Sequence, residues 1–309
     1  MDGFNESKQR RMARGVVVGL ALAFAVGANV YRLLVEHQPL GGSSLMFLGL
    51  PAVLSILLAM TPPAKTVTGR IMFGITLVLL VLAPIMGEGY LCILFASPLF
   101  YAVGAAVGKG IEAVRRMEDE RRRNSVRCVA AVLLVPMCLE GVFPATTIHR
   151  GQTVEVTRVV NGSAAQVEQA LAQSPRVSVE LPRFLRIGFP RPLRASGDGL
   201  AVGDARTIHF SGAEGDPEGD LVMQVTEREP GFARFETVSD GSKLTQWVGW
   251  EASDVQWRAM DATHTAVTWK IEFARELDPA WYFTPWERLA VREAAGYLIT
   301  ANAAPGVSR

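Results

Sequence analysis

The N-terminal half of this chain contains apolar runs that are long enough to cross a lipid bilayer. A spanning helix needs roughly 20 mostly apolar residues, and five segments approach that length. They are Gly15–Leu34, Ser44–Met60, Ile71–Met86, Tyr90–Val107 and Cys128–Phe143. The last is interrupted by Pro136 and Glu140 near its C-terminal end, where a carboxylate can reach the membrane interface. The pattern predicts a bundle of five transmembrane helices over residues 15–143 and excludes a purely soluble protein.

Two other interpretations of these runs are open. Any single run also fits a buried helix of a soluble protein, but no soluble domain covers four such runs within residues 15–107. The first run follows a basic tail and so also fits a cleaved signal peptide. Its apolar stretch is long for that role and further runs follow it, which favours an uncleaved anchor.

Basic residues predict the orientation of the spans, because positively charged loops stay on the cytoplasmic side. They gather in the tail 1–14, between the second and third spans, and in the loop 109–127, whereas the two remaining links contain none. Five spans therefore give a multi-pass inner-membrane protein with a cytoplasmic N-terminus. The soluble domain, residues 150–309, then lies in the periplasm or outside the cell. A fifth segment that does not cross would leave that domain in the cytoplasm.

The formal charge divides the chain at the same place. Residues 1–150 carry a net charge of +6 and residues 151–309 carry −5. An acidic soluble half repels phosphate, which argues against a nucleic-acid partner. The three cysteines, Cys92, Cys128 and Cys138, fall in or beside the spans, so the soluble half has neither a disulfide framework nor a zinc-binding spacing. We expect no metal site and no cofactor.

After Pro144 the hydrophobic pattern changes to a period of two, which is typical of half-buried strands. A first strand near 154–160 precedes a short helix over Ala164–Gln173, which Ser163 can cap. An irregular connection rich in Pro, Gly and Arg follows over Ser174–Gly203. Six further strands are expected at about Ala205–Ser211, Leu221–Glu229, Ala233–Val238, Leu244–Glu251, Val255–Met260 and Ala266–Arg275.

A long amphipathic helix is predicted from Pro279 to about Asn302, with Asp278 as its cap. Trp286, Leu289 and Tyr297 recur at helical spacing on one face, so we expect them to be buried against the sheet. The fold class is therefore α+β. The bundle of spans is followed by a curved antiparallel sheet around a long C-terminal helix.

Three short stretches then suggest a family. They are Val156–Val160 with the Asn-Gly-Ser that follows it, Gly197–Gly203, and Leu277–Phe283 at the start of the last helix. Over about residues 153–303 the chain resembles the START-like (SRPBCC, helix-grip) superfamily, and within it the polyketide cyclase/dehydrase-type group. The resemblance implies a lipophilic cavity between sheet and helix. The superfamily includes lipid carriers, receptors and aromatase/cyclases, so the fold does not select one activity.

The aromatic residues of the soluble half are candidates for the wall of such a cavity. Alternation places Trp257 on the face of Val255, and places Val267, Trp269 and Phe273 together on the last strand. Ordinary core packing predicts the same positions. We therefore expect ligand contacts from a set of six residues on these strands and the last helix. They are Trp257, Val267, Trp269, Phe273, Trp286 and Leu289.

The irregular connection is the second candidate region. Its apolar stretch carries several arginines, so Arg186, Phe189 and Arg191 are candidates for a flap at the cavity mouth that touches lipid headgroups. A packed irregular connection is the alternative. Arg206 and His209 lie on opposite faces of one strand, and either could orient a polar ligand group.

No catalytic arrangement is recognisable, so the catalytic residues are unknown. The acidic loop Asp216–Asp220 lacks the length and distal Glu of a calcium loop. The sequence predicts membrane-anchored binding of a hydrophobic small molecule or lipid, with no identified protein partner. The alternatives are a cyclase or dehydratase acting on a polyketide-like substrate, and a protein-binding assembly or signalling subunit.

Overall fold

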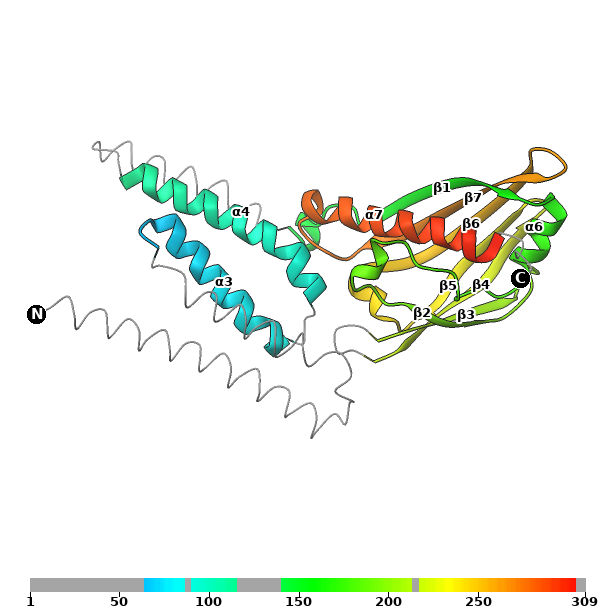
Figure 1. The fold of residues 1–309 in the computed structure, drawn as a ribbon, viewed down its shortest axis with the longest axis horizontal. Helices are drawn as coiled ribbons and strands as arrows, with labels where there is room; N and C mark the ends of the chain where they lie inside the picture. Colours follow the sequence, from blue (N-terminus) through cyan, green and yellow to red (C-terminus); the bar gives the residue numbers. More distant parts are fainter. Residues whose placement is uncertain (1–63, 87–89, 116–139, 213–216, 304–309) are drawn as a thin grey trace, which may run out of the picture. The chain divides into compact units, whose positions relative to one another are not determined.

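A computed structural model describes residues 64–86, 90–115, 140–212 and 217–303 (Figure 1). The chain divides into two compact units, Met1–Val132 and Leu133–Arg309. The boundary falls close to the change from apolar runs to alternating strands in the sequence.

The first unit contains two described helices, α3 (Val67–Met86) and α4 (Tyr90–Arg115). They contain the third and fourth expected spans and pack against each other, with a hydrogen bond between Thr76 Oγ1 and Tyr101 Oη of 2.7 Å. Within the described residues, the stretch Ile93–Val114 is long and apolar enough to cross a membrane. The first two expected spans, and the fifth up to residue 139, lie outside the described residues.

The second unit is built on one antiparallel sheet with the strand order β1-β7-β6-β5-β4-β3-β2. The strands are β1 (Gly151–Asn161), β2 (Pro192–Ser196), β3 (Ala205–Phe210), β4 (Gly219–Glu229), β5 (Phe232–Asp240), β6 (Val248–Ala259) and β7 (His264–Arg275). Strand β6 joins two strands that were expected separately, because the register shift between Trp250 and Ala252 keeps the chain in the sheet. Strand β2 lies in the connection that was expected to be irregular.

Two helices complete this unit. Helix α6 (Ala164–Leu171) begins as expected, with a capping box in which the Ser163 side chain accepts from the Gln166 backbone N–H. Helix α7 (Ala280–Leu298) runs along the inner face of the sheet and packs on β1 and β7 (Figure 1). A π-helical turn, η6 (Ile299–Ala303), extends it. The core between them is apolar, with Val167, Phe235, Val255, Ile271, Phe273 and Ile299 among its most buried side chains.

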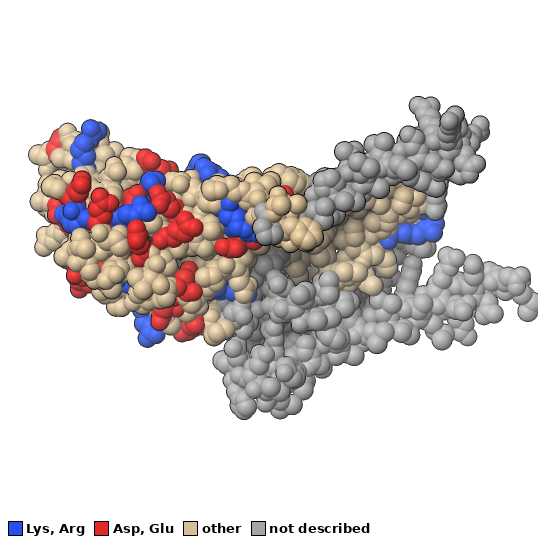
Figure 2. Space-filling view, turned by 180° about the vertical axis from the view of Figure 1, so that it is seen from behind, with Lys and Arg blue, Asp and Glu red and all other residues tan. Residues whose placement is uncertain are grey.

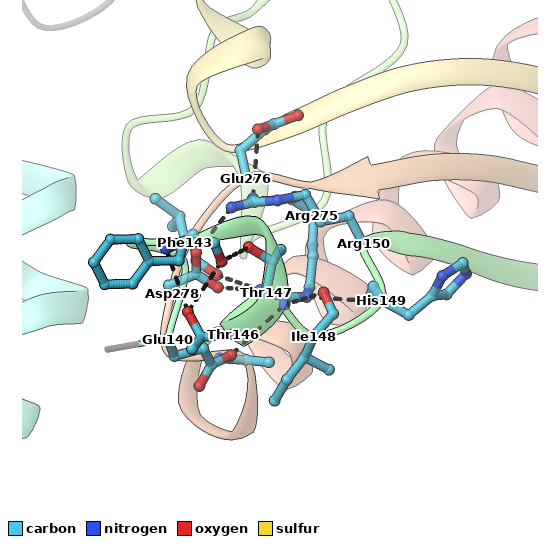
Figure 3. Close-up of polar contacts among 12 residues, drawn as sticks. Glu140, Phe143, Thr146, Thr147, Ile148, His149, Arg150, Arg275, Glu276 and Asp278 are labelled. Atoms are coloured by element: carbon cyan, nitrogen blue, oxygen red, sulfur yellow. Dashed lines mark hydrogen bonds and ion pairs between the residues drawn. The ribbon is translucent and has the colours of Figure 1, made fainter. Parts of the chain in front are cut away.

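The start of α7 differs from the expectation. Pro279 is the N-cap residue and makes no side-chain cap bond. Asp278 does not cap the helix, because its carboxylate pairs with two arginines, Arg150 at 2.9 Å and Arg275 at 2.5 Å (Figure 3). Glu140 accepts the Ala280 backbone N–H instead, at 2.8 Å. The first N–H group of α7 is thus bound by a residue that is distant in the sequence, and not by Asp278.

Candidate functional site

A small apolar cavity lies between α7 and the β2, β3, β4 side of the sheet. Its volume is about 90 Å³. The sheet contributes Ile208, Phe210, Leu221 and Met223, and the start of β6 adds Val248 and Trp250. Strand β2 adds Pro192. The remaining wall comes from α7 and from two connections, with Pro175, Val177, Leu181, Leu185, Phe189, Pro190, Leu244, Trp247, Ala290, Val291, Ala294, Tyr297 and Leu298.

Local sequence explains why space remains here. Alternation on β4 turns Leu221 and Met223 inward, and both are almost completely buried. The facing turns of α7 present Ala290 and Ala294, whose side chains end at Cβ. Because a close-packed interior is filled by side-chain volume, two alanines opposite large residues leave a gap.

The long connection between α6 and β2 forms one wall of the cavity. Its 3-10 helix η4 (Leu185–Ile187) buries Leu185. The Phe189 ring contacts two aromatic rings, Phe184 at 5.6 Å and Trp247 at 5.7 Å between centroids. Phe189 lies in the cavity wall, and its contact with a ligand stays a prediction.

The two arginines of the same segment lie outside the cavity wall. Arg186 pairs with Glu180 and its side chain is 40% exposed. The Arg191 backbone N–H donates to Ser211 Oγ at 2.9 Å, and its side chain is exposed. Headgroup contact by Arg186 and Arg191 stays a prediction.

The cavity wall has one titratable side chain among the residues that line it, Tyr297. This tyrosine is 8% exposed, and its hydroxyl has no hydrogen-bond partner in the described parts of the chain. Burial raises the pKa of Tyr297 above its ordinary value, so the hydroxyl keeps its proton. The Trp250 indole is already engaged and donates to Ser253 Oγ at 3.0 Å.

Four of the expected contact residues are buried on the inner face but do not line this cavity. Val267, Trp269 and Phe273 alternate along β7 as expected, in the half of the sheet that is filled by side chains. Trp257 is buried beneath the Arg228 guanidinium, 4.8 Å from its ring. Alternation therefore identified the face correctly. It carried no information about which part of that face is hollow.

The expected burial of Trp286 is wrong, since 40% of this residue is exposed. The buried stripe of α7 instead runs through Phe283, Glu287 and Val291, and Leu289 is only half-buried. Glu287 is charged, so its residue type does not indicate the buried face of the helix. Its carboxylate accepts the backbone N–H groups of Glu276 and Leu277 at 3.2 and 3.1 Å, and burial raises its pKa.

Arg206 and His209 are occupied by other contacts. Arg206 is 3% exposed, donates to the backbone oxygens of Leu171 and Gly199, and stacks on Phe235 at 4.7 Å. Burial lowers its pKa to about 10. It ties together α6, the β2–β3 connection and β5.

His209 bonds two carboxylates, Glu218 at 2.8 Å and Asp220 at 2.6 Å. Hydrogen bonds to Glu218 and then to Asp220 raise the pKa of His209. Within the described ranges, no group of three or more His, Cys, Asp or Glu side chains is placed to hold a metal ion. Asp216, at the start of the acidic loop, lies outside those ranges.

The strand order, the pairing of the first strand with the last, and the terminal helix across the inner face define the architecture of this unit. The C-terminal half has a helix-grip fold, in which an antiparallel sheet of seven strands surrounds a long C-terminal helix. No protein-family model matches the chain, and no curated protein sequence matches it. The helix-grip fold is therefore assigned from the arrangement of strands and helices and not from sequence similarity.

Several solved structures are similar to this helix-grip domain. Truncated norcoclaurine synthase from Thalictrum flavum is 13% identical over 50% of this chain and 96% of its own, with a TM-score of 0.32. The Zhui aromatase/cyclase from Streptomyces sp. R1128 is 15% identical over 49% and 86%, with a TM-score of 0.29. A START superfamily protein from Mycobacterium smegmatis is 12% identical over 48% and 92%, with a TM-score of 0.32.

Proposed function

We propose that this chain is a membrane-anchored protein whose helix-grip domain binds a hydrophobic small molecule or lipid noncovalently. The supporting observation is the wall of the cavity, which consists of aliphatic and aromatic side chains and includes Tyr297. Such a wall binds by removing apolar ligand surface from water, and we assign the Tyr297 hydroxyl the role of orienting the ligand. We expect the ligand to carry one hydrogen-bond acceptor on an otherwise apolar body.

The size of the cavity limits the ligand. Sites for drug-sized molecules occupy about 300–1,000 Å³, whereas this cavity measures about 90 Å³. It therefore encloses one ring or the end of an acyl chain unless the connection that carries Phe189 moves. Burying about 200 Å² of ligand at about 25 cal/mol per Å² contributes about 5 kcal/mol before ordering costs. That gain corresponds to weak or moderate affinity.

The enzymatic alternative needs a group that transfers protons. A cyclase or dehydratase acting on a polyketide-like substrate uses a positioned acid or base. Among the residues lining the cavity, Tyr297 is the one candidate, and its raised pKa makes it a donor rather than a base. The wall therefore favours binding. The protein-binding alternative predicts a filled core and an exposed apolar patch, and the cavity under α7 departs from the first of these two expectations.

Membrane anchoring is the second part of the proposal. It is supported by the apolar stretch Ile93–Val114 and by the five apolar runs of the sequence. The basic loops favour a multi-pass arrangement with the N-terminus in the cytoplasm and the helix-grip domain outside the inner membrane.

A ligand would have to extend beyond the cavity, towards β7 and the middle of β6, to contact the other expected residues. These are Trp257, Val267, Trp269 and Phe273.

Photolabelling of the full chain in lipid vesicles tests ligand binding. A long-chain alkyl diazirine should label peptides that contain Phe189, Trp247 or Leu298, because these residues line the cavity. Ala294→Phe should remove most of that label by filling the space. Ala266→Phe is the matched control, since it adds the same ring on the outer face of β7. Label that is absent from these peptides, or unchanged in Ala294→Phe, would refute the binding site.

A further inference from the structure

The large apolar side chains exposed on the helix-grip domain are unevenly distributed. Exposed aromatic residues in its described part are Phe143, Trp281 and Trp286, at 55%, 56% and 40%. Val142 and Ile148 are exposed by 60% and 52%. These five residues come from two short segments, 142–148 and 281–286. The other exposed apolar side chains are dispersed, at Val159, Leu193, Val202, Val238 and Met260.

Polar contacts fix the two segments side by side. Arg275 is completely buried and donates to the Ile148 backbone oxygen at 2.7 Å while it pairs with Asp278 (Figure 3). Glu140 accepts the Ala280 N–H at the start of α7. Gly141, at φ 76°, approaches Asp278 so closely that a Cβ would clash with its carboxylate. In Figure 3 the Phe143 ring and the Ile148 side chain point away from this polar cluster.

The outer face of α7 continues the patch. A solvent-open groove of about 650 Å³ is lined there by Ala280, Trp281, Thr284, Pro285, Trp286, Arg288, Leu289 and Arg292. Trp281, Arg288 and Arg292 recur at intervals that place them on one side of the helix. Arg288 donates to Gln152 Oε1 at 3.1 Å, and neither arginine forms an ion pair with a described residue. The surface thus combines large amphipathic rings with uncompensated positive charge.

We propose that this docking corner, formed by Val142, Phe143, Ile148, Trp281, Trp286, Arg288 and Arg292, rests on the surface of the lipid bilayer that anchors the chain. The inference depends on the membrane anchoring proposed above. Tryptophan rings favour the membrane–water interface, and guanidinium groups pair with lipid phosphates. Glu140, which bonds to Ala280 beside the corner, directly follows the apolar sequence 128–139. That continuity favours lipid over a separate protein.

Quenching by brominated lipid tests the proposal on the full chain. The chain is reconstituted in phosphatidylcholine–phosphatidylglycerol vesicles whose acyl chains are brominated near the glycerol. All six tryptophans lie between Trp247 and Trp286. We expect Trp281→Phe and Trp286→Phe to lower the quenched fraction of the emission. Trp257→Phe is the matched control, because Trp257 is 5% exposed and lies under Arg228.

A brominated lipid inside the cavity would quench through a different residue. Trp247 lines the cavity, so Trp247→Phe reports cavity occupancy separately from docking. Quenching that disappears only in Trp247→Phe would overturn the docking corner and leave ligand binding intact. The emission of Trp281 is taken as the difference between the wild-type chain and Trp281→Phe. If this emission is shielded from both brominated lipid and aqueous iodide, protein covers the corner and the proposal is overturned.

The arginines give a second readout. Replacing Arg288 and Arg292 by glutamine should weaken the increase in Trp281 quenching that accompanies a larger phosphatidylglycerol fraction. The two rings should still be quenched in neutral lipid, since their burial in the interface needs no charge. A dependence on anionic lipid that is unchanged in the double variant would remove the arginines from the docking corner.

Discussion

The rings of Phe189 and Trp247 meet edge to face, with 5.7 Å between their centroids and an interplanar angle of 72°. Phe189 belongs to the connection between α6 and β2, whereas Trp247 directly precedes β6. Both line the cavity, so this contact joins the connection between α6 and β2 to the segment that leads into β6. A ligand larger than the present cavity requires this contact to open.

Phe189→Ala should therefore speed ligand exchange. The substitution removes an aromatic pair worth about 0.5–1.5 kcal/mol beyond its area burial, and it widens the cavity. We expect faster release of a fluorescent lipophile from the reconstituted chain, measured by recovery of Trp emission. Leu193→Ala, at a residue that is 44% exposed, should leave the rate unchanged. Equal rates in both variants would show that Phe189 does not control access.

Tyr297→Phe should separate ligand recognition from folding. The hydroxyl has no partner among the described residues, so its removal should not lower the melting temperature. A ligand with an acceptor should lose about 0.5–1.5 kcal/mol of binding free energy, the net contribution of a hydrogen bond. A pure hydrocarbon of the same length should bind both proteins equally. Titration of the two ligands against both proteins makes this comparison.

Arg275→Met should strongly destabilise the domain. It removes one of the two arginine partners of Asp278 and the donor to the backbone oxygens of Ile148 and Leu277, at a fully buried position. Breaking a buried ion pair costs about 3–5 kcal/mol. The control is Arg186→Met, whose exposed pair is worth at most about 1 kcal/mol. Trp emission during thermal unfolding of the full chain in detergent reports both.

Acid should destabilise the outer face of the sheet through Glu272, which pairs with Arg234 and Lys270. Basic and acidic side chains are interspersed on the face of the domain that Figure 2 shows. Hydrogen bonds from Arg234 and then Lys270 lower the pKa of Glu272 from 4.5 to about 2. A lowered carboxylate pKa in the folded state stabilises the fold above the unfolded value. That contribution is lost as the pH falls from about 4.5 to about 2.

The measurement is the free energy of unfolding at several pH values for the wild-type chain and for Glu272→Gln. The difference between the two should shrink across that interval, because the wild-type carboxylate becomes protonated there. A constant difference would show that the ion pairs of Glu272 do not contribute to stability.

The orientation of the chain is tested by reporter fusions after Arg309. Basic loops predict that the helix-grip domain lies outside the inner membrane, so alkaline phosphatase should be active there and a green fluorescent protein dark. The control is the same pair of reporters placed after Arg123, in the expected cytoplasmic loop, where the opposite result is expected. Active fluorescence after Arg309 would mean that the segment 128–143 does not cross.

The sequence by itself determined the strand-rich α+β class, the capped helix after Ser163 and the long terminal helix. Those features depend on local patterns: a period of two for strands, a period of 3.6 for helices, and a Ser at a helix start. It also placed Val267, Trp269 and Phe273 on one buried face, because alternation along a strand is fixed by backbone geometry.

Only the tertiary structure decided where the inner face is hollow and how α7 begins. A cavity results from the combined volumes of side chains that are distant in sequence, here Ala290 and Ala294 opposite Met223 and Trp247. The hydrophobic period of a single helix or strand contains no information about this combined volume. The carboxylate of Asp278 fits a cap by position, yet Arg150, 128 residues away, holds it elsewhere. Long-range charge pairing and packing volume are properties of the assembled fold, and they override local preference.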